Sequence, residues 1–72
     1  MDLRRKANDL YVMVSSNIGG VSALNLEFSR SGGLIVTVSL DDLSLDMSII
    51  KECVLEACGI QGLDPIGIYL DI

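Results

Sequence analysis

The chain has no histidine and no tryptophan, and it has a single proline and two cysteines among its 72 residues. Histidine is the commonest general base near neutral pH, so its absence removes the usual proton acceptor of an active site. No serine stands in a nucleophile-elbow pattern, and the glycine pairs in NIGG and RSGG are not followed by the lysine of a phosphate-binding loop. We therefore predict that the protein is not an enzyme and that it binds no cofactor or metal ion.

The two cysteines, Cys53 and Cys58, are too few for a disulfide scaffold. Positions five apart on a helix point about 140° away from each other, so these thiols cannot converge on one metal ion from the same helix. We predict that both pack a helix, with Cys58 at the edge of its apolar side near the C-terminal end. A reactive Cys58 is the exception that keeps a thiol-dependent redox or carrier protein as an alternative.

Long hydrophobic runs are also missing. The apolar stretches are far shorter than the roughly 20 residues that span a bilayer. The opening MDLRRKAND is followed by neither an uninterrupted hydrophobic region nor a small-residue cleavage site, so we see no secretory signal. The sequence predicts a cytoplasmic protein, in a cell or in an infected host, without membrane association.

Basic residues are scarce: five against ten acidic residues, for a net charge of −5. A chain with this charge repels phosphate backbones, so direct binding of nucleic acid is disfavoured. Half of the residues are apolar and the mean hydropathy is +0.52, although a domain of this size buries only about 60% of its surface. We infer that part of the apolar surface is covered by another chain.

The order of elements follows from two periodicities. Apolar residues of the segment 3–18 recur at helical spacing. Apolar and polar residues alternate over 24–28 and 34–40, on either side of the turn RSGG, which predicts a β-hairpin. A second helix is expected over 47–58 and a last alternating strand over 66–72.

The ends of these elements carry recognisable signals. Asp2 can cap the first helix, and the acidic loop DDLSLD offers caps for the second. Gly59 is expected to end the second helix, with Ile60 folding back as its apolar companion. The resulting prediction is one α+β domain over residues 1–72, a two-layer α/β sandwich in αββαβ order. Both helices are expected on one face of a three-stranded sheet, whose strand order stays open.

Five apolar residues depart from the pattern and are our candidate partner-binding residues. Val12 and Leu55 project from the polar sides of their helices, and Met13 lies at a margin. Ile35 and Tyr69 are expected on the sheet face that the helices leave uncovered. We prefer this sheet face as the interface, because tyrosine is a frequent interface anchor with a rigid ring and a polar tip.

The element order, with GGLIVTVSLDD, a helix and then LDPIGIYLDI, resembles the N-terminal domain of bacterial small-subunit ribosome maturation factors. It is also similar in outline to BON domains and to the NifU-type iron–sulfur scaffold domain. These resemblances cover residues 24–72 and rest on the pattern of elements. The scaffold's paired metal-binding cysteines, two residues apart, have no counterpart here.

Together these observations predict a non-catalytic protein–protein interaction module. We expect a small acidic accessory or inhibitor protein, of the kind that phages and viruses carry, which binds a protein partner, a second copy of itself, or both. A ribonucleoprotein or ribosome assembly factor is the main alternative. Identifying the host proteins that bind the chain would separate the two.

Overall fold

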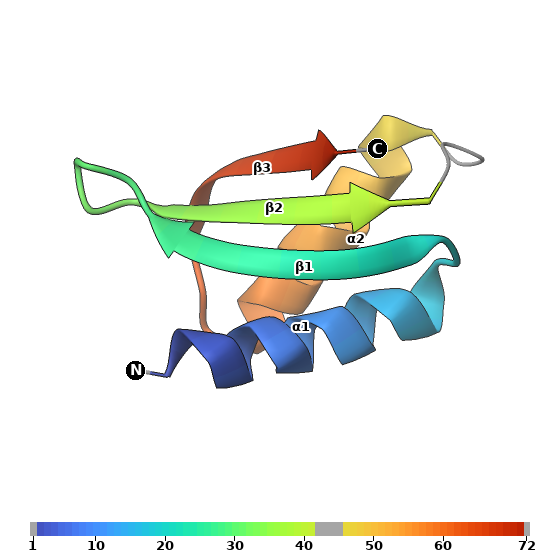
Figure 1. The fold of residues 1–72 in the computed structure, drawn as a ribbon, viewed down its shortest axis with the longest axis horizontal. Helices are drawn as coiled ribbons and strands as arrows, with labels where there is room; N and C mark the ends of the chain where they lie inside the picture. The colour runs from blue at the N-terminus through green and yellow to red at the C-terminus, as the bar shows by residue number, and fades with distance from the viewer. Residues whose placement is uncertain (1, 42–45, 72) are drawn as a thin grey trace.

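The computed structural model describes residues 2–41 and 46–71. Most of the acidic loop, residues 42–45, and the last position of the predicted final strand, Ile72, lie outside the described residues. The predicted order of elements is confirmed (Figure 1). The elements are α1 (Leu3–Asn17), β1 (Val21–Phe28), β2 (Leu34–Leu40), α2 (Met47–Ile60) and β3 (Pro65–Asp71).

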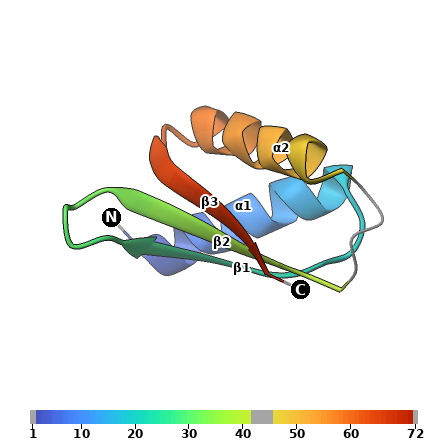
Figure 2. The same ribbon diagram turned by 90° about the horizontal axis from the view of Figure 1, so that it is seen from above.

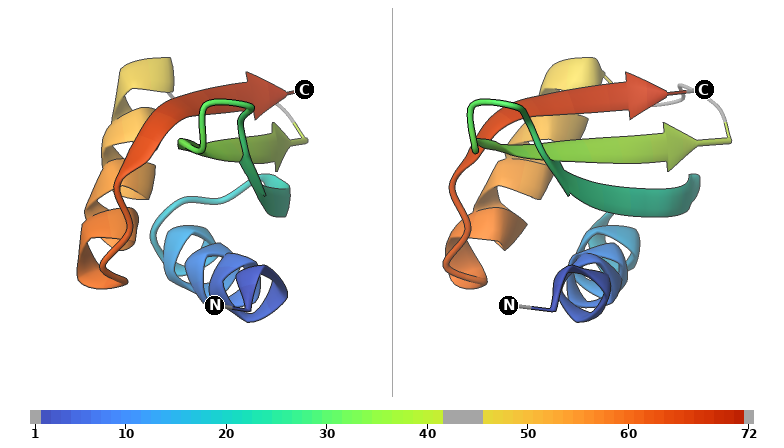
Figure 3. Two further views of the ribbon diagram at one scale, coloured as in Figure 1. Left: turned by 90° about the vertical axis from the view of Figure 1, so that its left-hand side faces the viewer. Right: turned by 60° about the vertical axis from the view of Figure 1, so that its left-hand side comes forward.

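The sheet has the strand order β1-β2-β3, which the sequence left open. β1 and β2 pair antiparallel as a hairpin, whereas β3 pairs parallel to β2 after the crossover through α2. α1 packs mainly against β1, α2 packs against β3, and the two helices pack against each other. Both helices lie on the same side of the sheet, and none of the described elements covers its other side (Figures 2 and 3). The predicted two-layer sandwich is therefore confirmed.

A single apolar core lies between the helices and the sheet. The central strand β2 contributes every second residue to it, as its alternating sequence predicts. The side chains with the least exposure come from α1, β2 and α2: Leu10, Val14, Val36, Val38, Val54 and Cys58. β3 adds Ile68 and Leu70, which are partly buried against this core. All five elements therefore bury one face, which is what their amphipathic patterns require.

The hairpin and the edge strand β1 each contain one local irregularity. Gly32 takes a positive φ of 88° in the turn, as expected for the glycines of RSGG, and its N–H donates to the Ser29 carbonyl at 2.9 Å. In β1 the register shifts between Val21 and Ala23. This bulge explains why Val21 and Leu24, three residues apart, are both buried.

The start of α1 and the end of α2 are joined. Asp2 caps α1, as predicted, by accepting hydrogen bonds from the backbone N–H groups of Arg4 and Arg5. One turn later the Lys6 ammonium donates to the Gln61 carbonyl at 3.3 Å and to its side-chain oxygen at 3.4 Å. Gln61 is the C-cap of α2, where a positive charge complements the negative end of the helix dipole. Lys6 therefore links the first turn of α1 to the C-terminal end of α2 by hydrogen bonds.

The end of α2 differs from the prediction. The helix continues past Gly59 to Ile60, and it is Gly62 that takes the left-handed conformation, with a φ of 73°. The Leu63 N–H donates to the Cys58 carbonyl at 2.8 Å, so the buried Leu63 is the apolar residue that folds back. The expectation for Ile60 was wrong, because 69% of this residue is exposed. Cys58, expected at the edge of the helix, is fully buried.

Candidate functional site

The uncovered face of the sheet is a grid of three strands and three rows. Cross-strand pairing sets Glu27, Ile35 and Gly67 in one row and Asn25, Thr37 and Tyr69 in the next. The third row contains Ala23, Ser39 and Asp71. These residues alternate with the core residues along each strand, so their side chains point away from the helices. The register thus brings together the two candidate residues that were predicted for this face.

Tyr69 and Ile35 stand in adjacent rows of this face, and Gly67 lies next to both of them. The Tyr69 ring leans back along β3 over Gly67, and its atoms lie 3.5–3.7 Å from the point where a Cβ of Gly67 would be. Gly67 is the direct neighbour of Ile35 in β2. The ring is therefore in van der Waals range of this backbone segment, and 60% of Tyr69 remains exposed. A large aromatic ring on a rigid strand is the kind of group that anchors an interface.

The charges of this face are all negative. Among the described residues of this face, the ionisable side chains apart from the Tyr69 phenol are Glu27 and Asp71, which are exposed at diagonally opposite corners of the grid. The basic residues lie elsewhere: Arg4, Arg5 and Lys6 are on α1, Lys51 is on α2 and Arg30 is in the hairpin turn. The helical layer therefore has charges of both signs, because Asp9, Glu52 and Glu56 also lie on the helices, whereas the described ionisable groups of the sheet face are acidic.

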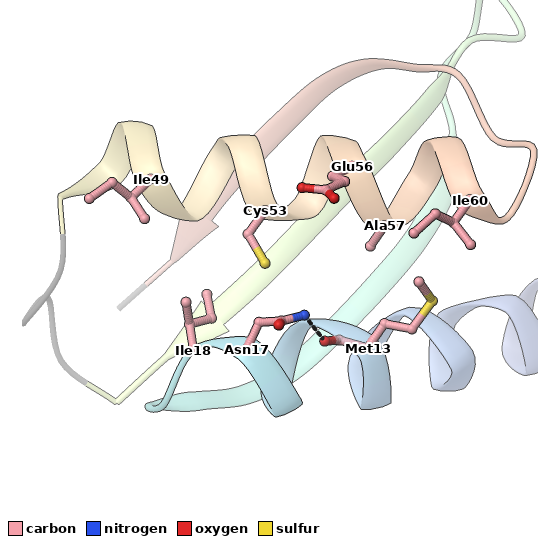
Figure 4. A pocket seen from close by; sticks show the side chains of 8 residues that line it. All are labelled: Met13, Asn17, Ile18, Ile49, Cys53, Glu56, Ala57 and Ile60. Carbon is pink, nitrogen blue, oxygen red and sulfur yellow. Dashed lines mark hydrogen bonds between the residues drawn. The ribbon is translucent and has the colours of Figure 1, made fainter.

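A groove of about 300 Å³ runs between the two helices on the other layer. It is lined mainly by apolar side chains (Figure 4), namely Met13, Asn17, Ile18, Ile49, Cys53, Glu56, Ala57 and Ile60. In the floor of the groove the Asn17 amide donates to the Met13 carbonyl at 2.9 Å. At one end the Gln61 amide lies 3.4 Å from the Met13 sulfur. Of these two contacts, the one from Gln61 involves the Met13 side chain, which lines the groove.

Cys53 is the only thiol that lines this groove. Burial raises the pKa of the Cys53 thiol, and the neighbouring Glu56 carboxylate raises it further. Burial also raises the pKa of Cys58, whose side chain is enclosed in the core. Raised thiol pKa values are the opposite of the activation found at catalytic or redox cysteines. At neutral pH both thiols are protonated and weakly nucleophilic.

The five candidate residues fall on different surfaces. Ile35 and Tyr69 lie together on the sheet face, whereas Met13 lines the groove between the helices. Val12 and Leu55 are exposed, at 56% and 51%, but line neither surface. The candidates therefore do not make one site. The sheet face contains the pair that the structure brings together.

Sequence reasoning missed most of the groove. Ile49 and Ile60 are the exposed apolar residues on its α2 wall, and neither was a candidate. The two successive isoleucines, Ile49 and Ile50, could have indicated that one of them is exposed on α2. Neighbouring positions on a helix are separated by about 100°, so the second isoleucine can enter the core while the first faces outward. Only Ile50 is buried. The opposing wall, from Met13 to Ile18, depends on how the helices pack, which the sequence pattern does not state.

The described residues give no sign of a metal site or of a membrane span. No three cysteine or carboxylate side chains among them gather as metal ligands. Neither described helix has the length and hydropathy to cross a membrane. Comparisons with protein-family models, with curated proteins and with solved structures give no match to this chain. The resemblances in element order therefore remain resemblances of pattern.

Proposed function

We propose that this protein is a non-catalytic binding domain that docks a protein partner on the open face of its sheet. One observation supports this proposal above the others. The Tyr69 ring packs over Gly67, the cross-strand neighbour of Ile35, on the side of the sheet that no described element covers. Interfaces of this kind use a few central aromatic and aliphatic anchors inside a polar rim. An accessory or inhibitor protein of 72 residues would act by covering a surface of its partner.

Binding suits the chemistry of the chain better than catalysis does. The chain has no histidine, and the pKa values of both thiols are raised by burial. The proposal accordingly assigns the protein no reaction of its own and no cofactor. A role in ribosome or ribonucleoprotein assembly would use the same face, so it differs from inhibition only in the identity of the partner.

The test is an affinity capture from the native host with two matched double variants. Ile35→Thr with Tyr69→Thr removes both large apolar side chains and places β-branched threonine, which suits strands, at both positions. Val12→Gln with Leu55→Gln removes two exposed apolar residues from the helical layer instead. Circular dichroism first establishes that both variants are folded. We expect a specific partner to be lost with the sheet variant and kept with the helix variant. Loss of an anchor of about 2 kcal/mol would weaken binding roughly 30-fold.

Three outcomes would contradict the proposal. Loss of the partner only with the helix variant would move the interface to the helical layer. Equal retention by both variants would remove the sheet face from consideration. Turnover of a substrate that is lost in the Ile35→Thr, Tyr69→Thr variant would make the protein an enzyme. A partner that is a single host enzyme or complex would favour inhibition, whereas ribosomal subunits would favour assembly.

A further inference from the structure

We infer that the surface bound by the open sheet face is basic, with lysine or arginine residues on both sides of an apolar anchor. This inference rests on the proposed function and specifies its partner. The sheet face has two carboxylates, Glu27 and Asp71, and no positive charge. A partner with positive charges opposite these corners would gain in association rate and in selectivity, whereas an acidic surface would be repelled.

The positions of Glu27 and Asp71 also determine the spacing of the complementary positive charges on the partner. Glu27 is in β1 and Asp71 in β3, two strand spacings apart and four residues apart along the strands. With about 4.8 Å between strands and 3.3 Å per residue, the diagonal is about 16 Å. On a helix that rises 1.5 Å per residue, about 11 residues cover this length, and positions i and i+11 lie on the same side. The line from Glu27 to Asp71 passes over Thr37, and Ile35 and Tyr69 lie together on one side of it. A helix with cations at i and i+11, and with an apolar stripe on the flank that faces Ile35 and Tyr69, therefore matches this face.

Other occupants match this face less well. A nucleic acid or an anionic membrane would meet two carboxylates and no cation. Two copies of the chain packed sheet to sheet would set acidic faces against each other, because a two-fold contact uses the same patch on both subunits. Contact between the sheet face of one copy and the basic residues on the helical layer of another would be complementary. Such a contact is heterologous and leads to open-ended assembly, which would be visible as growth with concentration.

The probe is a pair of matched helical peptides. Both have the same apolar stripe at i+4, i+7 and i+8; one has lysine at i and i+11, and the other has glutamate there. Each is titrated into the 15N-labelled chain at low and high salt. We expect the lysine peptide to shift the amide signals of Ile35, Thr37, Gly67 and Tyr69, and to bind more weakly as salt increases. The glutamate peptide should bind at least ten-fold more weakly.

Two double variants with the same change in net charge complete the design. Glu27→Gln with Asp71→Asn removes the carboxylates of the sheet face, and Asp9→Asn with Glu52→Gln removes two carboxylates from the helices. Exposed ion pairs are individually weak, so the first variant should reduce affinity for the lysine peptide about three- to ten-fold. The second variant should leave that affinity within about two-fold of the original.

The outcomes separate this inference from the proposed function. If the lysine peptide binds no more tightly than the glutamate peptide, or shifts residues outside the sheet face, the inference is wrong. If Ile35→Thr with Tyr69→Thr abolishes capture of the host partner while Glu27→Gln with Asp71→Asn has no effect, the sheet face binds and its partner is not basic. If the sedimentation coefficient of the chain without peptide increased with concentration, the occupant of the sheet face would be a second copy of the chain, and the inference of a foreign basic partner would be wrong.

Discussion

Replacing Val54 by alanine tests the packing of α2 directly, because Val54 is fully buried in the middle of that helix. The change removes two methyl groups, which lose about 1.6 kcal/mol of burial at about 0.8 kcal/mol each. The cavity that remains adds up to about 1 kcal/mol. Alanine is the better helix former and returns about 0.6 kcal/mol. We expect a net loss of about 2 kcal/mol in the free energy of unfolding, a large part of what a small domain possesses.

Val12→Ala is the matched control, because it makes the same change on an exposed position of α1. No cavity forms there, so the helix propensity of alanine should leave stability unchanged or raise it by about 0.5 kcal/mol. Urea unfolding followed by circular dichroism measures both variants. With a slope of about 1 kcal/mol/M, the midpoint of Val54→Ala should fall by about 2 M. Equal effects of the two substitutions would refute the packing of α2 on this core.

Three further predictions concern single groups. In the folded protein an alkylating reagent should modify Cys53 faster than the enclosed Cys58, and both faster as pH rises toward their raised pKa values; equal rates would contradict the burial of Cys58. Lys6→Met should lower stability by about 1 kcal/mol in urea unfolding, with a smaller effect in high salt, because a cation leaves the C-terminal end of α2. Asp46→Ala should destabilise the protein at pH 7, because hydrogen bonds from the Ser48 backbone N–H and hydroxyl hold the pKa of this carboxyl below its usual value. The part of this contribution that depends on ionisation is present above the unfolded pKa and is lost as pH falls through the folded one, so the difference between the two proteins should shrink as the carboxyl is protonated.

Periodicity was enough to predict the five elements but not how β3 joins the sheet. In β3, Ile68 and Leu70 would present the same apolar face beside either strand of the hairpin. The choice is made by the packing of the helices. α1 occupies the side of the core beneath β1, so α2 covers the opposite side, and the chain returns from it along the free edge of β2. The place of β3 therefore depends on the positions of both helices, which the periodicity within one helix or strand does not contain.

The end of α2 was ambiguous for a different reason. Both Gly59 and Gly62 can adopt a positive φ, and each is followed by a large aliphatic residue. The core decides between them, because Leu63 can reach the buried side of the helix from Gly62. This later ending extends the helix beyond Cys58 and brings Leu63 back beside it. The later end of α2, with its turn at Gly62, therefore also accounts for the burial of Cys58, the thiol that the sequence left open as reactive.

The apolar residues of the open face are not spread evenly over it, and this restricts where an anchor could dock. Ile35, Gly67 and the leaning Tyr69 ring lie toward the hairpin end, whereas the row at the other end is Ala23, Ser39 and Asp71. Phe28 and Ile66, both exposed, lie at the hairpin end of the same sheet, and the Ile66 side chain packs over the backbone of Gly33. Beyond the reach of the helices, this end has apolar groups on both sides of the sheet. Because Ile35 and Gly67 share the row of Glu27, the apolar anchor of a partner on the open face would lie nearer Glu27 than Asp71.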